Sequence, residues 1–461
     1  MFDAYVAHHA RLRPTAPAIV TAAGATSFAT FDAEITRTAI LLRTLAGGTD
    51  RPVAVEIENV RLNWLVTLAL ARLGLPSAPG ADRDCPLRIS DRAAADPTLL
   101  IGEREIAAIL SGPVPMLARP ARAPEDCGRI LLSSGTTGQE KRIALSWRMI
   151  DASIRNVPVT YGAMPGPWLT ATGNHTILGF VLALGCWGLG EALLMPDRPL
   201  DGAQLRALRP RLVAMTPGQL DHLLDDLPAD MPRQSVRVVT GGGPMPPRLL
   251  ARTRRALTED LMSVYGASEC GAVAVATPAL CDRVPWAAGV VLPGVTVEIV
   301  DESGDAVAVG ALGHVRIRSD RTANAYLRGE ADAFREGWFW PGDLGRLDTQ
   351  GVLCLEGRAD DLMNLGGQKV LPAWIEAAAL TAPGVREAAA FSLIDDDGWE
   401  RCWLAFAVED GFEEQALGEA LRPQLAAAER ISWLHVDRLP RNAMGKIERN
   451  RLRDLARTIT D

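Results

Sequence analysis

Short apolar runs alternate with amphipathic helical patterns through the first two thirds of the chain. Residues 53–57 (VAVEI) predict a buried strand, and residues 61–74 predict an amphipathic helix directly after it. At residues 129–134, RILLSS is expected to be a strand that runs into a glycine loop, with a helix near residues 147–156. Because strands that alternate with helices form parallel sheets covered by helices, the pattern predicts an α/β fold.

The alternation continues and then changes character. Further strands are expected at residues 211–217 and 236–243, each followed by a helix. Residues 295–301 and 313–319 then form two strand patterns around the turn sequence ESGD, and residues 346–357 repeat the arrangement around a glycine. Consecutive strands joined by short turns indicate antiparallel hairpins. This part of the chain is therefore expected to form a small β-barrel or meander.

The chain is long enough for more than one domain. Its 461 residues are 48% hydrophobic and 23% charged, so a large core can form without disulfides or structural metals. We expect a large domain over residues 1–359, with the β-barrel near 290–359, and a small α+β domain over 360–461.

Charge and cysteine usage limit the partners and the compartment. The net charge of −8 argues against a dedicated nucleic-acid binder. The seven cysteines are scattered without a CxxC pair, which is typical of reduced thiols in the cytoplasm. Residues 176–190 are apolar but shorter than the roughly 20 residues that a membrane helix needs, so they predict a buried helix and no membrane span.

Residues 133–142 read SSGTTGQEKR and follow a buried strand. Glycines in such a loop can turn successive backbone N–H groups inward around phosphate, while hydroxyls and Lys141 add donors and charge. The loop is not a Walker A motif, because Arg142 stands where Ser or Thr would follow the lysine. A plain surface turn is the alternative, since Gly, Ser and Thr also favour turns.

Five further segments carry residue types suited to a nucleotide. They are GGGPMP at 241–246, VYGASE at 264–269, GWFWPGDLG at 337–345, GRADDLMNLGGQKVLPAWIE at 357–376 and LPRNAMGKIERNRLR at 439–453. Glycines allow a flat base to approach the backbone. An unpaired Glu269 before an apolar run would be costly, and a metal partner would relieve that cost. Each segment alone is a weak signal.

Taken in this order, the segments resemble the acyl-adenylating superfamily, which contains acyl-CoA synthetases, non-ribosomal peptide adenylation domains and beetle luciferases. The resemblance covers nearly the whole chain. It implies ATP-dependent activation of a carboxylic acid as acyl-AMP, release of pyrophosphate and transfer of the acyl group to a thiol. The cofactors it implies are ATP, Mg²⁺ and coenzyme A.

The resemblance also implies roles for individual residues. Glu269 would hold Mg²⁺, Ser268 would contact phosphate, and Lys446 would stabilise the charge that develops on the transferring phosphoryl group. The residues expected to bind ATP or AMP are Ser133, Ser134, Gly135, Thr136, Thr137, Gly138, Lys141, Gly241, Gly242, Gly243, Tyr265, Asp343 and Arg358. Of these, Tyr265 would stack on adenine and Asp343 would accept from the ribose hydroxyls.

Three further groups follow from the same resemblance. His175, Gly266 and Ala267 are expected to line the acyl pocket. Asp360 would be the hinge between the domains, and Gly366 and Gly367 would line the tunnel for the thiol. Relatives that activate amino acids have an aspartate in the segment that corresponds to residues 171–180, and this chain has none. An acid without an amine, either aryl or short to medium aliphatic, is therefore favoured.

Some residues depart from the family pattern. Ser268 and Pro341 stand where threonine is usual, and Glu140 replaces a proline. Three alternative functions stay open: an acyl-AMP ligase that loads a carrier protein, a nucleotide-binding relative without catalysis, and a luciferase-like oxygenase. The sequence leaves the oligomeric state open between a monomer and a homodimer.

Overall fold

The computed structural model describes residues 1–46, 51–80, 84–93, 97–114, 116–134, 140–228, 230–328, 331–365, 368–395, 398–424, 431–441 and 447–460. The chain divides into two compact units. The first unit is Met1–Thr296 with Ile317–Phe339, and the second is Val297–Arg316 with Trp340–Asp461. The division thus passes through the region expected to be a β-barrel, and a hinge at Asp360 stays a prediction.

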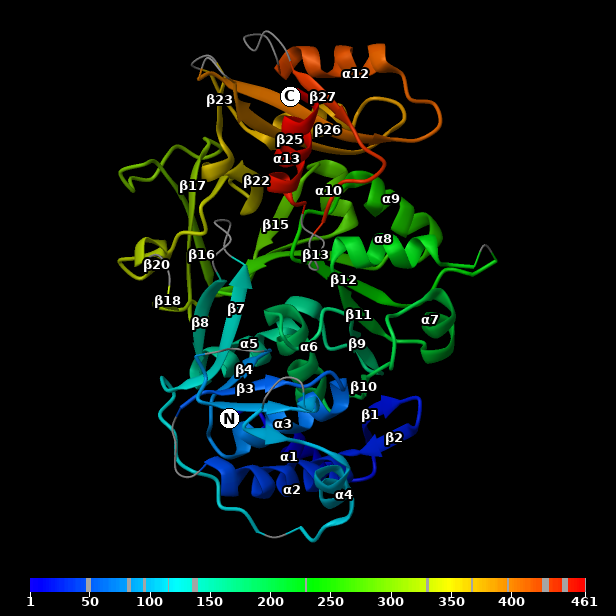
Figure 1. Cartoon of the computed structure of the whole chain (residues 1–461), viewed down its shortest axis with the longest axis vertical. Coiled ribbons are helices and arrows are strands. Elements are labelled where there is room, and N and C mark those ends of the chain that lie inside the picture. Colours follow the sequence, from blue (N-terminus) through cyan, green and yellow to red (C-terminus); the bar gives the residue numbers. More distant parts are fainter. Residues whose placement is uncertain are drawn as a thin grey trace. The chain divides into compact units, whose positions relative to one another are not determined.

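One sheet of the first unit carries the strand that precedes the phosphate loop (Figure 1). In spatial order its strands are β18 (Tyr326–Arg328), β8 (Glu140–Ser146), β7 (Cys127–Ser134), β4 (Ser77–Pro79), β3 (Val53–Glu56), β5 (Leu87–Ser90) and β6 (Leu99–Leu100). The strands from β7 to β6 pair in parallel, whereas β7–β8 and β8–β18 are antiparallel. The strand β8 is a finding of the structure, because the sequence patterns predict a helix next after the loop.

The other sheet of the first unit is longer. Its order is β2 (Gly24–Ser27), β1 (Pro17–Thr21), β10 (Leu193–Leu194), β9 (Trp168–Thr170), β11 (Leu212–Met215), β12 (Arg237–Gly241), β13 (Leu261–Ala267), β14 (Gly271–Ala276) and β15 (Ala287–Val291). The strands from β1 to β13 are parallel, and β14 and β15 continue the sheet in antiparallel pairing. The predicted α/β fold with parallel sheets is confirmed.

Helices separate and cover these sheets. They are α1 (Ala4–Leu12), α2 (Phe28–Ala46), α3 (Val60–Arg72), α4 (Glu103–Ser111), α5 (Trp147–Tyr161), α6 (Ile177–Gly188), α7 (Gly202–Leu208), α8 (Pro217–Asp225), α9 (Pro247–Ala256) and α10 (Pro278–Arg283). The helices α5 and α6 pack against each other, α5 against β7 and β8, and α6 against β9 and β11 (Figure 1). They therefore form a layer between the two sheets.

The helix α6 is apolar on all sides, as expected of a helix in the core, and most of its residues are buried. Phe180 and Trp187 are completely buried, and both rings pack against Trp64 of α3. The indole of Trp187 donates to the carbonyl of Ala18 at 2.9 Å. The prediction of a core helix at residues 176–190 is confirmed. None of the helices in the described ranges combines the length and the apolarity that a membrane crossing requires.

The second unit contains the hairpins and the α+β elements predicted from the sequence. Its strands are β16 (Val295–Val300), β17 (Gly313–Ser319), β21 (Asp343–Leu347), β22 (Val352–Arg358), β23 (Met363–Leu365), β24 (Gln368–Val370), β25 (Val385–Ile394), β26 (Glu400–Val408) and β27 (Ser432–His435). The last residues of β17 pair with β20 (Trp338–Phe339), which pairs with β19 (Phe334–Arg335), all in the first unit.

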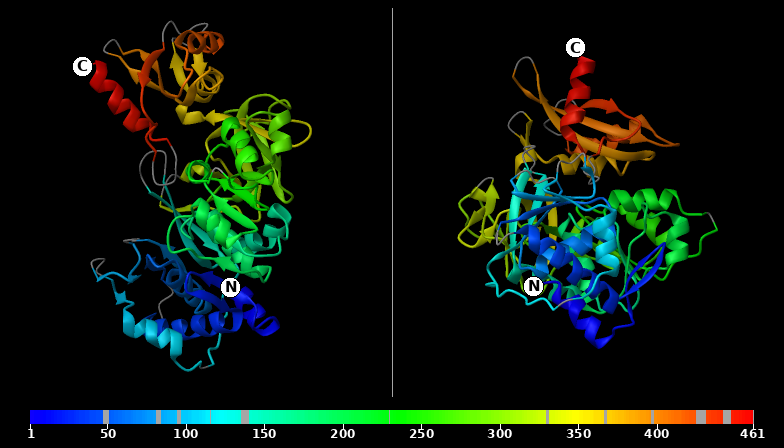
Figure 2. Two further views of the ribbon diagram at one scale, coloured as in Figure 1. Left: turned by 90° about the vertical axis from the view of Figure 1, so that its right-hand side faces the viewer. Right: turned by 60° about the horizontal axis from the view of Figure 1, so that its bottom comes forward.

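The end of the chain forms a small sheet with helices. The strands β25, β26 and β27 form one sheet, with β25–β26 antiparallel and β26–β27 parallel. The helices here are α11 (Pro372–Ala379), α12 (Glu414–Leu421) and α13 (Arg449–Thr460). Both α11 and α13 pack on β25, and α13 is the red helix beside the orange strands in Figure 2.

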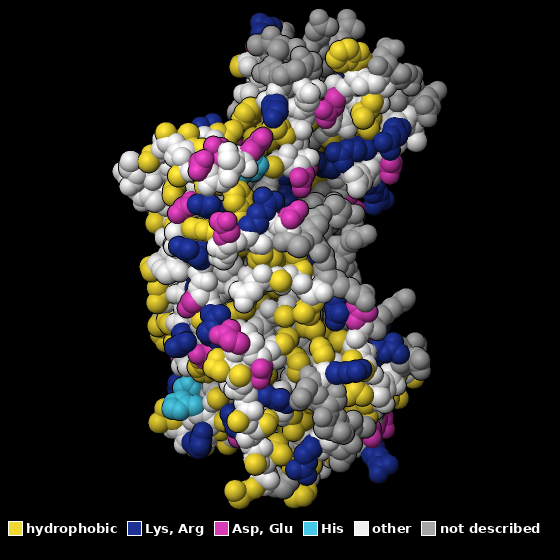
Figure 3. Space-filling model, turned by 90° about the vertical axis from the view of Figure 1, so that its left-hand side faces the viewer, with side chains coloured by type: hydrophobic (Ala, Val, Ile, Leu, Met, Phe, Trp, Pro, Cys, Tyr) yellow, Lys and Arg dark blue, Asp and Glu magenta, His cyan; other side chains and the backbone are white. Residues whose placement is uncertain are grey.

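On the face drawn in Figure 3, basic and acidic side chains are interspersed.

Candidate active site

Four neighbouring parallel strands, β9, β11, β12 and β13, end at the same edge of their sheet. The segment at residues 171–176 follows β9, the glycine turn 241–243 follows β12, and Tyr265 lies near the end of β13. Gly241 is paired with Val264. Since ligands of α/β proteins bind outside the carboxyl ends of parallel strands, this edge is the candidate site.

Local contacts hold the segments at this edge together. The side chain of Gln219 donates to the carbonyl of Ala171 at 3.0 Å, which ties the segment after β9 to α8. A Cβ on Gly241 would lie 3.1 Å from the side chain of Leu178 in α6, so only glycine fits there comfortably. The next residue, Gly242, has a φ of +87°, a backbone conformation that favours glycine. The predicted adenine turn therefore packs against the predicted acyl-pocket segment.

Gly266, predicted to line the acyl pocket, also has a structural reason to be glycine. The ladder between β13 and β14 has an irregularity between Tyr265 and Gly266. A Cβ on Gly266 would lie 2.2 Å from the carbonyl oxygen of Gly271 across the hairpin. The backbone of the two strands is too close at this point for any side chain there.

Glu269 lies in the turn between β13 and β14 and is 7% exposed. Its Oε1 accepts a hydrogen bond of 2.8 Å from the hydroxyl of Tyr326. Its backbone carbonyl accepts from the amide of Ala323 at 2.7 Å. Glu269 is therefore a buried carboxylate whose hydrogen-bond donor is a tyrosine, and its expected role as a Mg²⁺ ligand stays a prediction.

Tyr326 also reaches the strand that follows the phosphate loop. Lys141 is paired with Ser133 across β7 and β8, and its Nζ lies 5.2 Å from the centroid of the Tyr326 ring. Tyr326 thus contacts two residues that the sequence assigns to the nucleotide site. Sequence reasoning missed it, because no local pattern connects residue 326 with residue 269 or 141.

A buried arginine connects β7 with the acyl-pocket segment. Arg129 donates to the hydroxyl of Ser77 at 2.8 Å and to the carbonyl of Asn174 at 2.7 Å. Its guanidinium lies 4.4 Å from the ring centroid of Phe180, and burial lowers its pKa to about 9. Although His175 is exposed as a whole residue, desolvation of its imidazole, followed by the positive charge of Arg129, lowers its pKa. The imidazole is therefore neutral at pH 7.

In the second unit, Asp343 and Arg358 lie directly opposite each other on β21 and β22. The Nη1 of Arg358 is 3.3 Å from Oδ1 of Asp343 and donates to the carbonyl of Pro341 at 2.6 Å. Only the backbone of Pro341 takes part in this bond, so proline can replace the usual threonine without losing it. Asp360 is 73% exposed, with Oδ2 3.9 Å from Nη2 of Arg358.

Glu269 is suited to bind a divalent cation whose other ligands are phosphate oxygens. Within the described ranges, no three His, Cys, Asp or Glu side chains are grouped as a metal site. Mg²⁺ in nucleotide enzymes is held by one or two carboxylates together with substrate phosphates and water. A single buried carboxylate, with one oxygen bonded to a neutral hydroxyl, is a donor set of this kind.

Comparison with known proteins identifies the family. Residues 79–327 match the family model described as AMP-binding enzyme. The 3-hydroxybenzoate–CoA ligase of Aromatoleum sp. (strain CIB) is 31% identical over 365 residues, which are 75% of this chain and 69% of the relative. The chain belongs to the AMP-binding enzyme family.

Other relatives agree with this membership. A 2-succinylbenzoate–CoA ligase from Bacillus licheniformis is 30% identical over 71% of this chain and 70% of its own length. Among solved structures, ATP-bound MatB from Rhodopseudomonas palustris has a TM-score of 0.87, with 24% identity and 100% of each chain covered. At that identity the structural likeness supports the fold, and the expectation of an acyl-adenylating fold is confirmed.

Not every predicted site residue of this AMP-binding enzyme can be placed. Ser133 and Ser134 end β7. The residues Gly135, Thr136, Thr137, Gly138, Gly366, Gly367 and Lys446 lie outside the described ranges. Lys141 and Glu269 belong to the first unit, whereas Asp343 and Arg358 belong to the second. That these four residues bind one nucleotide together stays a prediction.

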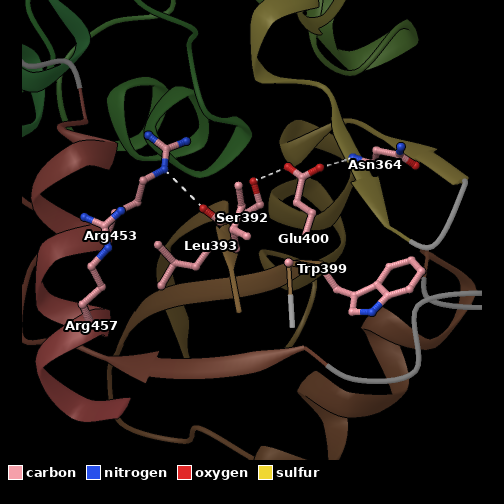
Figure 4. Close-up of a pocket in the computed structure, with 9 residues that line it drawn as sticks. Asn364, Ser392, Leu393, Trp399, Glu400, Arg453 and Arg457 are labelled. Carbon is pink, nitrogen blue, oxygen red and sulfur yellow. Dashed lines mark hydrogen bonds between the residues drawn. The ribbon is translucent and has the colours of Figure 1, made fainter. Parts of the chain in front are cut away.

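A groove of about 680 Å³ in the second unit contains none of the predicted site residues (Figure 4). Its polar groups bond to one another: Ser392 donates to Glu400 at 2.5 Å, and the amide of Asn364 donates to Glu400 at 2.7 Å. The guanidinium of Arg453 donates to the carbonyl of Ser392 at 3.3 Å. Since none of the residues expected to bind nucleotide or acid lines this groove, the candidate site remains at the strand ends.

Proposed function

We propose that this AMP-binding enzyme is an AMP-forming acid–thiol ligase that converts a carboxylic acid to its coenzyme A thioester. The observation that carries the proposal is the group of Glu269, Tyr326 and Lys141. Through Tyr326, the turn after β13 contacts the strand that follows the phosphate loop. The turn after β13 lies at the sheet edge where the glycine turn and the acyl-pocket segment meet. Tyr326 contacts both the buried carboxylate of Glu269 and the ammonium of Lys141. A carboxylate can bind the metal and an ammonium can bind the phosphates of a metal-bound polyphosphate.

The first half-reaction forms the acyl-AMP. An oxygen of the substrate carboxylate attacks the α-phosphorus of ATP, the bond to the pyrophosphate oxygen breaks, and pyrophosphate leaves. Lys141 and the loop 133–138 would hold the phosphates, and Asp343 would accept from the ribose. The Lys446 ammonium would stabilise the negative charge that develops during attack. Glu269 would hold Mg²⁺, which would neutralise charge on the phosphate oxygens.

The second half-reaction releases AMP. The thiol sulfur attacks the acyl carbonyl, the C–S bond forms, the acyl C–O bond to AMP breaks, and the thiol proton passes to solvent. One site would serve both reactions if the small domain rotates about Asp360, withdraws Lys446 and brings Gly366 and Gly367 to the thiol. The exposed position of Asp360 is compatible with such a hinge.

The acid is proposed to be an aryl acid. Two of the relatives are named as ligases of 3-hydroxybenzoate and 2-succinylbenzoate. The segment 171–180 carries no acidic side chain that could pair with a substrate amine. The neutral imidazole of His175 could pack edge-to-face or in an offset stack against a flat aryl ring. A short or medium aliphatic acid is the alternative within the same reaction.

The acceptor and the compartment follow from the same reasoning. Coenzyme A is proposed because several relatives are named as CoA ligases, and a carrier-protein thiol is the alternative. Scattered cysteines without a paired motif favour the cytoplasm.

One screen tests the proposal. Pyrophosphate release is measured with ATP, Mg²⁺ and a panel of aryl, aliphatic and dicarboxylic acids, with and without coenzyme A, and thioester is detected by mass. We expect release that depends on an aryl acid, with a CoA thioester as product. Release without transfer to free coenzyme A would favour a carrier protein. No acid-dependent release with any acid would refute the proposal.

A further inference from the structure

Tyr326 is the residue that contacts both ends of the candidate metal and phosphate site, although no motif includes it. Its hydroxyl donates to Oε1 of Glu269 at 2.8 Å, and its ring centroid lies 5.2 Å from Nζ of Lys141. The first contact is to a carboxylate and the second is of the cation–π type, which extends to about 6 Å. One side chain therefore links a proposed metal ligand with a proposed phosphate ligand.

The backbone on either side of Tyr326 is fixed to the same two partners. On one side, the amide of Ala323 donates to the carbonyl of Glu269 at 2.7 Å. On the other, β18 pairs with β8, and Tyr326 is opposite Ile143, two residues after Lys141. The Tyr326 ring also packs edge-on against Phe334, with centroids 5.0 Å apart. Strand pairing and ring packing therefore hold the phenol in this position.

The choice of a phenol as the donor has a chemical consequence. A carboxylate has two oxygens and can accept several hydrogen bonds. A lysine or arginine bonded to Glu269 would cancel its negative charge and would compete with a cation. A hydroxyl donor carries no formal charge, so it can orient the carboxylate and leave its negative charge for a metal. Partners of this kind around metal ligands orient them and tune their affinity.

We infer that Tyr326 is a positioning residue for the nucleotide-bound metal. Its hydroxyl holds Oε1 of Glu269 so that the carboxylate faces the cation, and its ring supports the Lys141 ammonium beside the phosphates. This inference rests on the proposed function, because it concerns the same nucleotide site.

Two variants separate the two roles. Tyr326→Phe keeps the ring and removes the hydroxyl, whereas Tyr326→Leu removes both. Metal binding is measured without turnover, by Mn²⁺ electron paramagnetic resonance in the presence of a non-hydrolysable ATP analogue, and metal-free binding of the analogue is measured by calorimetry. Tyr326→Phe is expected to weaken Mn²⁺ binding by about 10- to 100-fold and to leave metal-free binding unchanged. Tyr326→Leu is expected to weaken metal-free binding as well.

A matched control exists in the same unit. The hydroxyl of Tyr5 donates to Oδ1 of Asp151 at 2.7 Å, the same bond type at a place with no predicted site residue. Tyr5→Phe is expected to leave Mn²⁺ affinity unchanged. Tyr326→Phe is also made in a Glu269→Gln background, where it should have no further effect because the carboxylate is already gone. This second comparison remains informative if one variant loses stability.

The outcomes are distinguishable. If the wild type binds neither the analogue nor Mn²⁺ with it, the proposed function fails and the inference fails with it. If the wild type binds both and Glu269→Gln weakens Mn²⁺ binding, but Tyr326→Phe matches the wild type, only the positioning role is refuted. An equal loss of Mn²⁺ affinity in Tyr326→Phe and Tyr5→Phe would assign the effect to general destabilisation and would also refute it.

Discussion

Replacing Asp343 by asparagine tests whether this carboxylate binds the ribose. The side chain is 15% exposed, so water competes weakly with a ligand that reaches it. A hydrogen bond to a charged group contributes about 1.5–3 kcal/mol. Asparagine keeps the shape and removes the charge, so ATP affinity is expected to fall by about tenfold to 150-fold. Isothermal calorimetry with a non-hydrolysable ATP analogue measures the change.

The fold should survive this substitution. Arg358 keeps its hydrogen bond to the carbonyl of Pro341, and the ion pair it loses with Asp343 has an N–O distance of 3.3 Å in a partly exposed position. Such pairs contribute about 1 kcal/mol or less. Glu298→Gln is the control, because it removes another carboxylate–arginine pair of the same unit, the one with Arg316. The control is expected to bind the analogue as the wild type does.

A chemical double-mutant cycle then identifies the contact. The wild type should lose affinity for 2′-deoxy and 3′-deoxy analogues, because Asp343 can accept from both ribose hydroxyls. The Asp343→Asn variant should lose much less with the same analogues, since the charged acceptor is already gone. If the variant and the wild type lose the same factor, to within about 0.5 kcal/mol, Asp343 does not bind the ribose and the assignment is wrong.

Three other substitutions probe separate parts of the argument. Lys446→Ala is expected to abolish acid-dependent pyrophosphate release but still convert preformed acyl-AMP to thioester; equal loss of both half-reactions would contradict its role. Because the pKa of His175 is below its ordinary 6.5, the folded protein binds fewer protons near pH 6 than the unfolded chain, and the free energy of unfolding falls as the pH drops below that value. Arg129→Met should raise the pKa of His175 in an NMR titration. An unchanged pKa would show that the positive charge of Arg129 does not act on His175. Gly289→Ala should lower the melting temperature strongly, with a cost of about 3 kcal/mol or more, because its Cβ would lie 2.2 Å from the backbone of Val275 at a φ of +134°; a wild-type melting temperature would refute this.

The sequence alone determined the fold class and much of the order of the strands and helices, and it predicted the residues of the site. Alternating strand and helix patterns have fixed periods that any window of the chain reveals, and the phosphate-loop and VYGASE segments are contiguous. The core helix at 176–190 was predicted for the same reason: a run without polar side chains must be buried. Membership in the AMP-binding family confirms the fold class and the resemblance that these local signals indicated.

Only the tertiary structure decided which residues from distant segments contact one another. Tyr326 and Glu269 are 57 positions apart, and their hydrogen bond forms where the backbone amide of Ala323 also donates to the carbonyl of Glu269. Asp343 meets Arg358 through the register of β21 and β22, which side-chain periodicity does not specify uniquely. A sequence pattern records which face of a strand is buried. It does not record which strand will lie beside it, because pairing is set by the whole sheet and its crossovers.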